Sequence, residues 1–135
     1  MKDSINSKRG RFILIFFAIV LIGGIWFMFL RTSGDPIDGL DGKWLRTDGD
    51  YTIEISDVAE DGKMTAKYFN PTPINVGRSA WRINEDRLQI YVELQDENYP
   101  GSLYQLYYDA ENEKLIGSYY QAVSRQTFNV EFNKK

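Results

Sequence analysis

The hydrophobic positions of this chain follow two different patterns, which divide it at about residue 31. Residues 12–30 are nineteen consecutive positions without a charged side chain, and fourteen of them are Leu, Ile, Val or Phe. As a helix this segment would extend about 28 Å, which matches the hydrocarbon core of a bilayer. We therefore expect a transmembrane helix over 12–30. From residue 44 onward, apolar and polar residues alternate with a period of two, which indicates strands with one buried face.

The charges on either side of the apolar segment predict its orientation. Four basic residues and one acid precede it, whereas Arg31 is followed by Asp35, Asp38 and Asp41. The positive-inside rule then leaves residues 1–11 in the cytoplasm and places the rest across the membrane. A cleaved signal peptide is the alternative, but its apolar region is usually shorter and ends in small residues. For a bacterium we expect a single-pass protein of the cell (inner) membrane with an extracytoplasmic C-terminal domain.

The remainder of the chain is expected to be a linker followed by one small β domain. Residues 31–42 are rich in Gly, Asp and Pro and show no periodicity, which is typical of a linker. Residues 43–135 are enough for a single domain. The alternation predicts about eight strands, at 44–46, 51–56, 64–69, 79–84, 88–95, 103–109, 114–121 and 127–132.

Two connections carry their own signals. Pro71 and Pro73 lack the backbone donor of a strand ladder, so residues 70–75 are predicted to be a loop that interrupts pairing. Pro100 and Gly101 suit a type II turn over residues 99–102. Short strands with tight turns and no helix between them favour an antiparallel up-and-down barrel, because closure removes exposed edges. An open sandwich is the alternative.

Composition narrows the chemistry that this domain can perform. The chain contains no His and no Cys, so it lacks the usual acid/base residue at neutral pH, the thiolate nucleophile and the commonest zinc ligands. Ser, Thr, Tyr, Lys and carboxylates remain, but no pair of acids and no glycine-rich phosphate loop is recognisable. From residue 31 on there are 12 basic and 18 acidic side chains, which argues against a nucleic-acid partner. We expect no catalysis, no cofactor and no metal.

The first predicted strand opens with Gly42-Lys43-Trp44. This Gly-x-Trp opening resembles that of lipocalins and other calycins, in which the Trp plugs one end of the barrel. The resemblance implies a basic residue near the last strand that packs over the Trp, and Arg125 is the candidate. Avidins share the opening, but apart from Trp81 the later tryptophans of the biotin pocket are missing, so biotin is not implied.

A second resemblance covers residues 42–132. It rests on Phe69-Asn70-Pro71, Pro73-Ile74-Asn75-Val76, Tyr99-Pro100-Gly101-Ser102 and Tyr120-Gln121-Ala122-Val123, with Gln126, Phe128 and Val130. These segments are similar to an uncharacterised family of small exported or membrane-anchored bacterial all-β proteins. The resemblance implies a protein of the bacterial envelope and no particular activity.

The aromatic residues of the strands suggest two kinds of site beside their ordinary role in packing. An interior site would be left open by the small residues Ala66 and Gly117, and its candidate residues are Trp44, Tyr68, Trp81, Tyr119 and Arg125. An outer site would contact another protein or a second copy, and its candidates are Ile74, Arg78, Ile116 and Tyr120.

These observations lead to one expected function and one alternative. We expect a membrane-anchored extracytoplasmic binding module that contacts another envelope protein or forms a homo-oligomer. The alternative is a lipocalin-like carrier or sensor of a small apolar ligand.

Overall fold

The computed structural model describes residues 34–135. The predicted membrane helix over 12–30 and the basic N-terminus lie outside these residues. Within 34–135, no helix has the length and apolar character needed to cross a membrane. Residues Ile37–Lys135 form one compact unit. The folded domain therefore includes part of the segment that was expected to be a linker up to residue 42.

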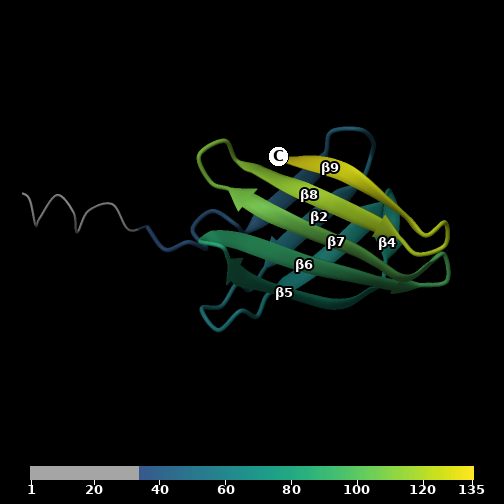
Figure 1. Cartoon of the computed structure of the whole chain (residues 1–135), viewed down its shortest axis with the longest axis horizontal. Helices are drawn as coiled ribbons and strands as arrows, with labels where there is room; N and C mark the ends of the chain where they lie inside the picture. The colour runs from purple at the N-terminus through teal and green to yellow at the C-terminus, as the bar shows by residue number, and fades with distance from the viewer. Residues whose placement is uncertain (1–33) are drawn as a thin grey trace, which may run out of the picture. The chain divides into compact units, whose positions relative to one another are not determined.

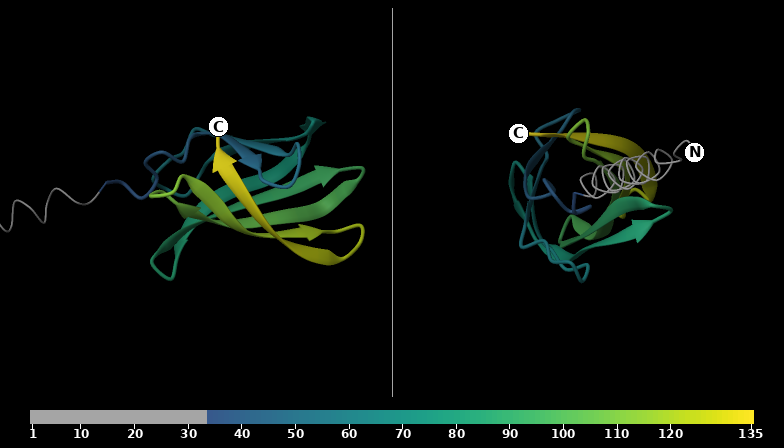
Figure 2. Two further views of the ribbon diagram at one scale, coloured as in Figure 1. Left: turned by 90° about the horizontal axis from the view of Figure 1, so that it is seen from above. Right: turned by 90° about the vertical axis from the view of Figure 1, so that its left-hand side faces the viewer.

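Nine antiparallel strands form a single sheet (Figure 1). They are β1 (Gly42–Arg46), β2 (Thr52–Ser56), β3 (Thr65–Asn70), β4 (Thr72–Ile74), β5 (Val76–Asn84), β6 (Arg87–Asp96), β7 (Tyr99–Asp109), β8 (Lys114–Gln121) and β9 (Gln126–Lys134). Their order in the sheet is β4-β3-β2-β1-β9-β8-β7-β6-β5, so the last strand returns to pair with the first. Viewed end-on, the sheet curls into a ring (Figure 2). The prediction of an all-β, antiparallel up-and-down fold is confirmed, and the nine strands, in place of eight, form a nearly closed barrel.

The ring is nearly closed, because the edge strand β5 meets the residues that precede β3 over a short stretch only. One β-bridge joins Lys63 to Ala80, and the Trp81 backbone N–H donates to the Gly62 carbonyl at 2.9 Å. The Ser79 hydroxyl donates to the Met64 carbonyl at 2.9 Å. These contacts hold β5 against the beginning of β3 and complete the barrel there.

Pro73 lies in a short strand and Pro71 in the bend before it, so the prediction of an unpaired loop over residues 70–75 is wrong. β4 pairs with β3 in the register Tyr68 with Ile74, Phe69 with Pro73 and Asn70 with Thr72. The reason is position: β4 is an edge strand, and an edge strand has one side on which no backbone donor is needed.

The predicted turn at 99–102 is also wrong, because these residues begin β7. The chain turns at residues 97–98, and the pairing of β6 with β7 shifts register between Leu94 and Gln95. Gly101 has a φ of +85°, the conformation expected in a type II turn. In the structure that conformation lies opposite the register shift, where a bulge bends the strand.

The interior of the barrel is a packed core. Leu88, Ile90, Val92 and Leu94 are buried on one face of β6, as the alternation predicts. Four aromatic side chains fill the space between the strands and are at most 1% exposed: Trp44, Tyr68, Tyr104 and Phe132. The Tyr104 ring packs edge-on against Phe132 with 5.5 Å between the ring centroids.

The two small residues expected to open the interior have other roles. Ala66 is 8% exposed and belongs to the core cluster. At Gly117, an added Cβ would lie 2.1 Å from the Gln105 carbonyl oxygen. Gly117 therefore permits the close approach of β7 and β8 and opens no cavity between them.

Candidate functional site

The two ends of the barrel are built differently, and one of them is closed by the chain itself. Leu40, which precedes β1, is fully buried, and its carbonyl accepts a hydrogen bond of 3.0 Å from the Trp44 indole N–H. The Tyr108 hydroxyl donates to the Asp38 carbonyl at 2.8 Å, and the Lys134 ammonium donates to the Gly39 carbonyl. We call this region the closed end. Its polar side chains are satisfied by the main chain of residues 38–40.

The opposite end holds a pocket, and we call it the open end. The last residues of β1, β3 and β8 meet there with residues at the beginnings of β2, β7 and β9. The pocket has a volume of about 190 Å³ and is lined by Arg46, Tyr51, Tyr68, Asn70, Tyr99, Tyr119, Gln121 and Phe128. Hydroxyl, amide and guanidinium groups make up most of its polar lining. It is therefore suited to a small ligand that forms hydrogen bonds.

Arg46 is the charged residue at the centre of this pocket. It is the last residue of β1 and follows Trp44 by two positions, so alternation directs its side chain inward as well. The side chain is only 10% exposed. Its Nε and Nη2 donate to the Asp48 carboxylate at 2.5 and 2.8 Å, and Nη1 donates to the Tyr104 hydroxyl at 3.0 Å. Two-point pairing of this kind fixes the plane of the guanidinium.

Aromatic rings flank the same guanidinium. The Arg46 Cζ lies 4.3 Å from the centroid of Tyr51 and 5.7 Å from that of Tyr119. Burial alone would lower the pKa of Arg46, but its hydrogen bonds with Asp48 and Tyr104 outweigh burial and raise that pKa above its usual range. The hydrogen bond from Arg46 in turn lowers the pKa of the Asp48 carboxyl. Both groups are therefore charged at neutral pH.

A pair of tyrosine hydroxyls lies beneath the pocket. The hydroxyl oxygens of Tyr68 and Tyr104 are 3.1 Å apart and share a hydrogen bond. Burial raises the pKa of Tyr104 to about 12 and also raises the pKa of Tyr68 and of Tyr119. These phenols stay protonated at neutral pH, so they act as neutral hydrogen-bonding groups and not as bases.

The rim of the pocket is formed by residues that face solvent more openly. The Asn70 side-chain amide donates to the Tyr99 hydroxyl at 2.5 Å. The Gln121 side chain accepts a hydrogen bond of 2.6 Å from the Ser124 hydroxyl, and Phe128 is 41% exposed. This rim offers amide groups and one aromatic face to an incoming molecule.

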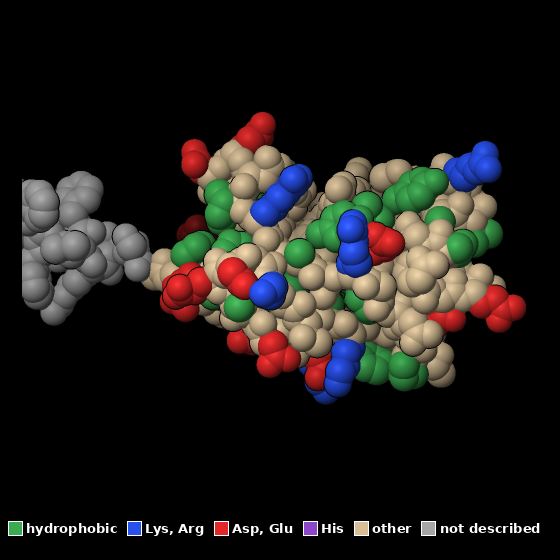
Figure 3. Space-filling model, turned by 90° about the horizontal axis from the view of Figure 1, so that it is seen from below, with side chains coloured by type: hydrophobic (Ala, Val, Ile, Leu, Met, Phe, Trp, Pro, Cys, Tyr) green, Lys and Arg blue, Asp and Glu red, His purple; other side chains and the backbone are tan. Residues whose placement is uncertain are grey.

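The groups at the open end are suited to hydrogen bonding and to contacts with aromatic rings. The described chain, residues 34–135, contains no group of three or more acidic side chains placed to hold a metal ion. Figure 3 shows basic and acidic side chains interspersed on one face of the molecule, with hydrophobic side chains between them. The pocket itself presents hydrogen-bond donors and acceptors, aromatic faces and a guanidinium that already has a carboxylate partner.

The interior candidates from the sequence are divided between the two ends. Trp44 lies at the closed end, whereas Tyr68 and Tyr119 line the open-end pocket. Trp81 packs against the core from β5, and its indole N–H donates to the Ala59 carbonyl at 2.8 Å. It anchors the loop over residues 57–63 to the strand and is not part of the pocket.

The cation over Trp44 is Lys134 and not Arg125. The Lys134 ammonium lies 5.3 Å from the centre of the Trp44 ring system. Arg125 lies in the turn between β8 and β9, at the other end of β9 from Lys134, with a φ of +56°. The prediction for Arg125 is wrong because strand direction places the beginning of β9 at the open end, far from Trp44.

The candidates for an outer site do not form one surface. Ile116 and Tyr120 face outward from β8 and are 39% and 38% exposed. Arg78 lies in the same cross-strand row as Tyr120, through Glu93 and Leu103. Ile74 pairs with Tyr68 and packs against the core, so it contributes to the barrel wall.

Several residues of the pocket were not identified from the sequence, although alternation contained a signal for them. Arg46 follows the inward Trp44 by two residues, and Gln121 follows Tyr119 in the same way. At the closed end, Lys134 follows Phe132 with the same spacing. A charged or polar residue can occur at a position that alternation assigns to the buried face of a strand. It then indicates either that the predicted register is wrong or that the buried face carries a polar site.

Comparison with protein-family models, with curated proteins and with solved structures found no match to this chain.

Proposed function

We propose that this protein is a non-catalytic binding module of the bacterial envelope that holds a small polar ligand, or the polar end of a larger one, in the open mouth of the barrel. The observation that carries the proposal is the asymmetry of the two ends. The closed end is filled by the chain itself, whereas the open end keeps a pocket of about 190 Å³ around a guanidinium held by Asp48 and Tyr104.

The location of the module follows from the sequence and is part of the proposal. The apolar segment over 12–30 would anchor the protein in the cell membrane with residues 1–11 in the cytoplasm. The resemblance to calycins supports a ligand-binding barrel, since the Gly-x-Trp opening occurs here with a cation over the Trp ring. Deletion of residues 1–30 should move the protein from the membrane fraction to the soluble fraction.

The ligand is proposed to be polar in place of the apolar one considered from the sequence. Trp44, Tyr68, Tyr104 and Phe132 fill the apolar interior, which leaves the polar mouth for binding. A hydroxyl- or carboxylate-bearing molecule would form hydrogen bonds with Asn70, Gln121 and the free positions of the Arg46 guanidinium.

Native mass spectrometry of the full chain, released from detergent micelles, tests this proposal. We expect an additional mass that is lost on denaturation and that is absent from a Gln121→Trp variant, in which the larger side chain occupies the mouth. Gln95→Trp is the matched control, because Gln95 is exposed and lies outside the pocket. A bare chain in the wild type, or an added mass unaffected by Gln121→Trp, would contradict binding in the mouth.

A further inference from the structure

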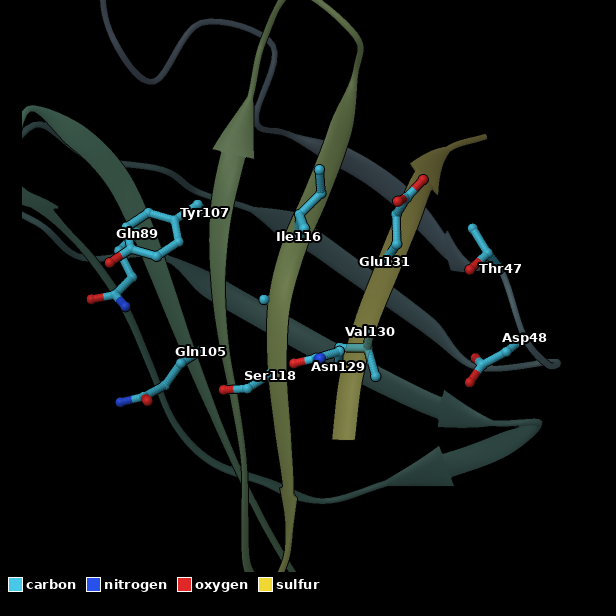
Figure 4. A pocket seen from close by; sticks show the side chains of 11 residues that line it. Thr47, Asp48, Gln89, Gln105, Tyr107, Ile116, Ser118, Asn129, Val130 and Glu131 are labelled. Atoms are coloured by element: carbon cyan, nitrogen blue, oxygen red, sulfur yellow. The ribbon is translucent and has the colours of Figure 1, made fainter. Parts of the chain in front are cut away.

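The outer face of β5 to β9 carries a groove that is separate from the open end. Two adjoining hollows of about 790 and 670 Å³ lie on this face and share Gln89 and Gln105. Figure 4 shows the side chains that line the larger hollow, with Gln105, Ser118 and Asn129 directed to the same side of the sheet. Together the hollows form one continuous groove across five strands.

The floor of the groove is a cross-strand row of small and polar side chains. Residues opposite one another in successive strands are Ala80, Tyr91, Gln105, Ser118 and Asn129. Adjacent strands are about 4.8 Å apart, so five strands give a floor about 19 Å long. This row contains no charged residue.

Three neighbouring side chains of the floor are free to bind a ligand. Within residues 34–135, the side chains of Gln105, Ser118 and Asn129 have no hydrogen-bond partner. Each can donate and accept a hydrogen bond. A molecule with many hydroxyl or amide groups could pair with all three at once.

Tyrosine rings and charged residues border this floor. Tyr107 stands beside it on β7, and its hydroxyl accepts a hydrogen bond of 2.9 Å from the Asn84 amide. The charged residues that line the groove already have partners: Arg78 pairs with Glu93, Asp48 with Arg46 and Glu131 with Lys114, and Arg82 donates to the Gln89 amide oxygen at 2.9 Å. An uncharged ligand therefore suits the groove better than a strongly anionic or cationic one.

A polypeptide is a poorer fit to this face. From β6 to β9 the backbone groups pair on both sides, so a peptide cannot add there as a further strand; of the five strands, β5 is an edge strand of the sheet. The central part of a protein interface is usually apolar, whereas the middle of this floor consists of the amide and hydroxyl side chains of Gln105, Ser118 and Asn129.

We propose that the groove binds a neutral, linear polysaccharide that carries hydroxyl and acetamido groups, laid across β5 to β9. The amide side chains of Gln105 and Asn129 pair with its acetamido and hydroxyl groups. The rings of Tyr91 and Tyr107 border the sugar chain, with the Cζ atoms of Arg78 and Arg87 lying 5.6 and 4.1 Å from the respective ring centroids. This inference does not depend on the ligand proposed for the open end, because no residue lines both the groove and the open-end pocket.

Isothermal titration of the full chain in detergent micelles tests this inference, with chitohexaose and cellohexaose as probes. We expect chitohexaose to bind, and the double variant Gln105→Ala/Asn129→Ala to weaken binding by about tenfold, since two hydrogen bonds are lost. Asn98→Ala is the matched control, because this exposed amide lies in the β6–β7 turn outside the groove.

The opposing outcomes are equally defined. Absence of binding to both hexasaccharides would overturn the inference, as would binding that the double variant does not weaken. Binding of a flexible Gly-Ser peptide at Gln105 and Asn129, without binding of either hexasaccharide, would assign the groove to a polypeptide and overturn it too. Equal affinity for the two sugars would retain the polysaccharide and remove the specific role of the acetamido group.

Discussion

The closed and open ends of the barrel both place a cation against aromatic rings, but they satisfy their polar groups in different ways. At the closed end, Trp44 and Lys134 form hydrogen bonds with main-chain carbonyls of residues 39–40. At the open end, Arg46 forms hydrogen bonds with the side chains of Asp48 and Tyr104. The main-chain segment that supplies the acceptors at the closed end also covers that end of the barrel. At the open end the acceptors are side chains, and a pocket remains beside them.

Because of this difference, we expect the closed end to contribute mainly to stability and the open end mainly to ligand binding. At the closed end Leu40 and Trp44 are fully buried, so burial of their apolar groups contributes to the free energy of unfolding. The open end leaves Phe128 and the Asn70 and Gln121 amides accessible to a ligand. Substitutions at the two ends should therefore have different effects, and the following predictions compare them.

The largest difference should come from aromatic truncation. Trp44→Ala removes a fully buried ring and its hydrogen bond to Leu40, and should lower the free energy of unfolding by about 3–5 kcal/mol. Phe128→Ala at the open end removes a ring that is 41% exposed and should cost less than about 1 kcal/mol. Urea unfolding followed by circular dichroism measures both. Equal losses would remove the distinction between the ends.

A leucine pair tests whether the segment before β1 is part of the fold. Leu40→Ala should cost about 2–4 kcal/mol, because Leu40 is fully buried over Trp44. Leu45 faces outward from β1 and is 37% exposed, so Leu45→Ala should cost less than about 1 kcal/mol. The same unfolding measurement applies. A small effect of Leu40→Ala would mean that residues 38–40 can leave the barrel without loss of stability.

The hydroxyl groups of the two ends offer a smaller contrast. Tyr104→Phe leaves the Tyr68 hydroxyl and one Arg46 donor without their partner in a buried region, and should cost about 1–2 kcal/mol. Tyr108→Phe at the closed end removes a solvent-exposed hydrogen bond to Asp38 and should cost about 0.5 kcal/mol. Thermal unfolding of the two variants compares them. A larger loss of stability for Tyr108→Phe than for Tyr104→Phe would contradict this prediction.

The smallest effect concerns pH at the open end. The pKa of Asp48 is lower in the folded protein than in the unfolded chain, so the folded state binds fewer protons at this carboxyl. Its contribution is complete above the unfolded pKa of about 4 and is lost as the pH falls through the lower folded pKa. The carboxylate is 55% exposed, so the contribution should stay below about 1 kcal/mol.

Asp48→Asn is the control for this pH dependence. Stability measured by urea unfolding between pH 7 and pH 3 should decline less in the variant than in the wild type. An identical decline in both proteins would show that the Arg46–Asp48 pair does not contribute to acid sensitivity.

Much of the fold was predictable because alternation has a direct structural meaning. The period of two at Leu88, Ile90, Val92 and Leu94 indicates a strand and also identifies its buried face. Tight turns between such strands favour antiparallel neighbours, which is why the up-and-down order was accessible. The edge position of β4 was not predictable, because a strand tolerates Pro73 only if one of its sides has no neighbouring strand that needs a backbone donor.

The candidate site was predictable only in part. Tyr68 and Tyr119 were identified as inward residues and do line the pocket. Arg46 was in phase with Trp44, but its role depends on Asp48 and on Tyr104, which is 58 residues away along the chain. Lys134 was not identified as the cation over Trp44, because that contact depends on which end of β9 returns to β1.

The sequence by itself determined that most residues after the apolar segment form antiparallel strands and, for several of these strands, which side is buried. It did so because side-chain direction in a strand depends only on local backbone geometry. The tertiary structure decided which end of the barrel is closed, because closure requires residues 38–40 to meet Trp44, Tyr108 and Lys134. It likewise decided where Gln105, Ser118 and Asn129 form one row, because that row exists only in the register of three paired strands.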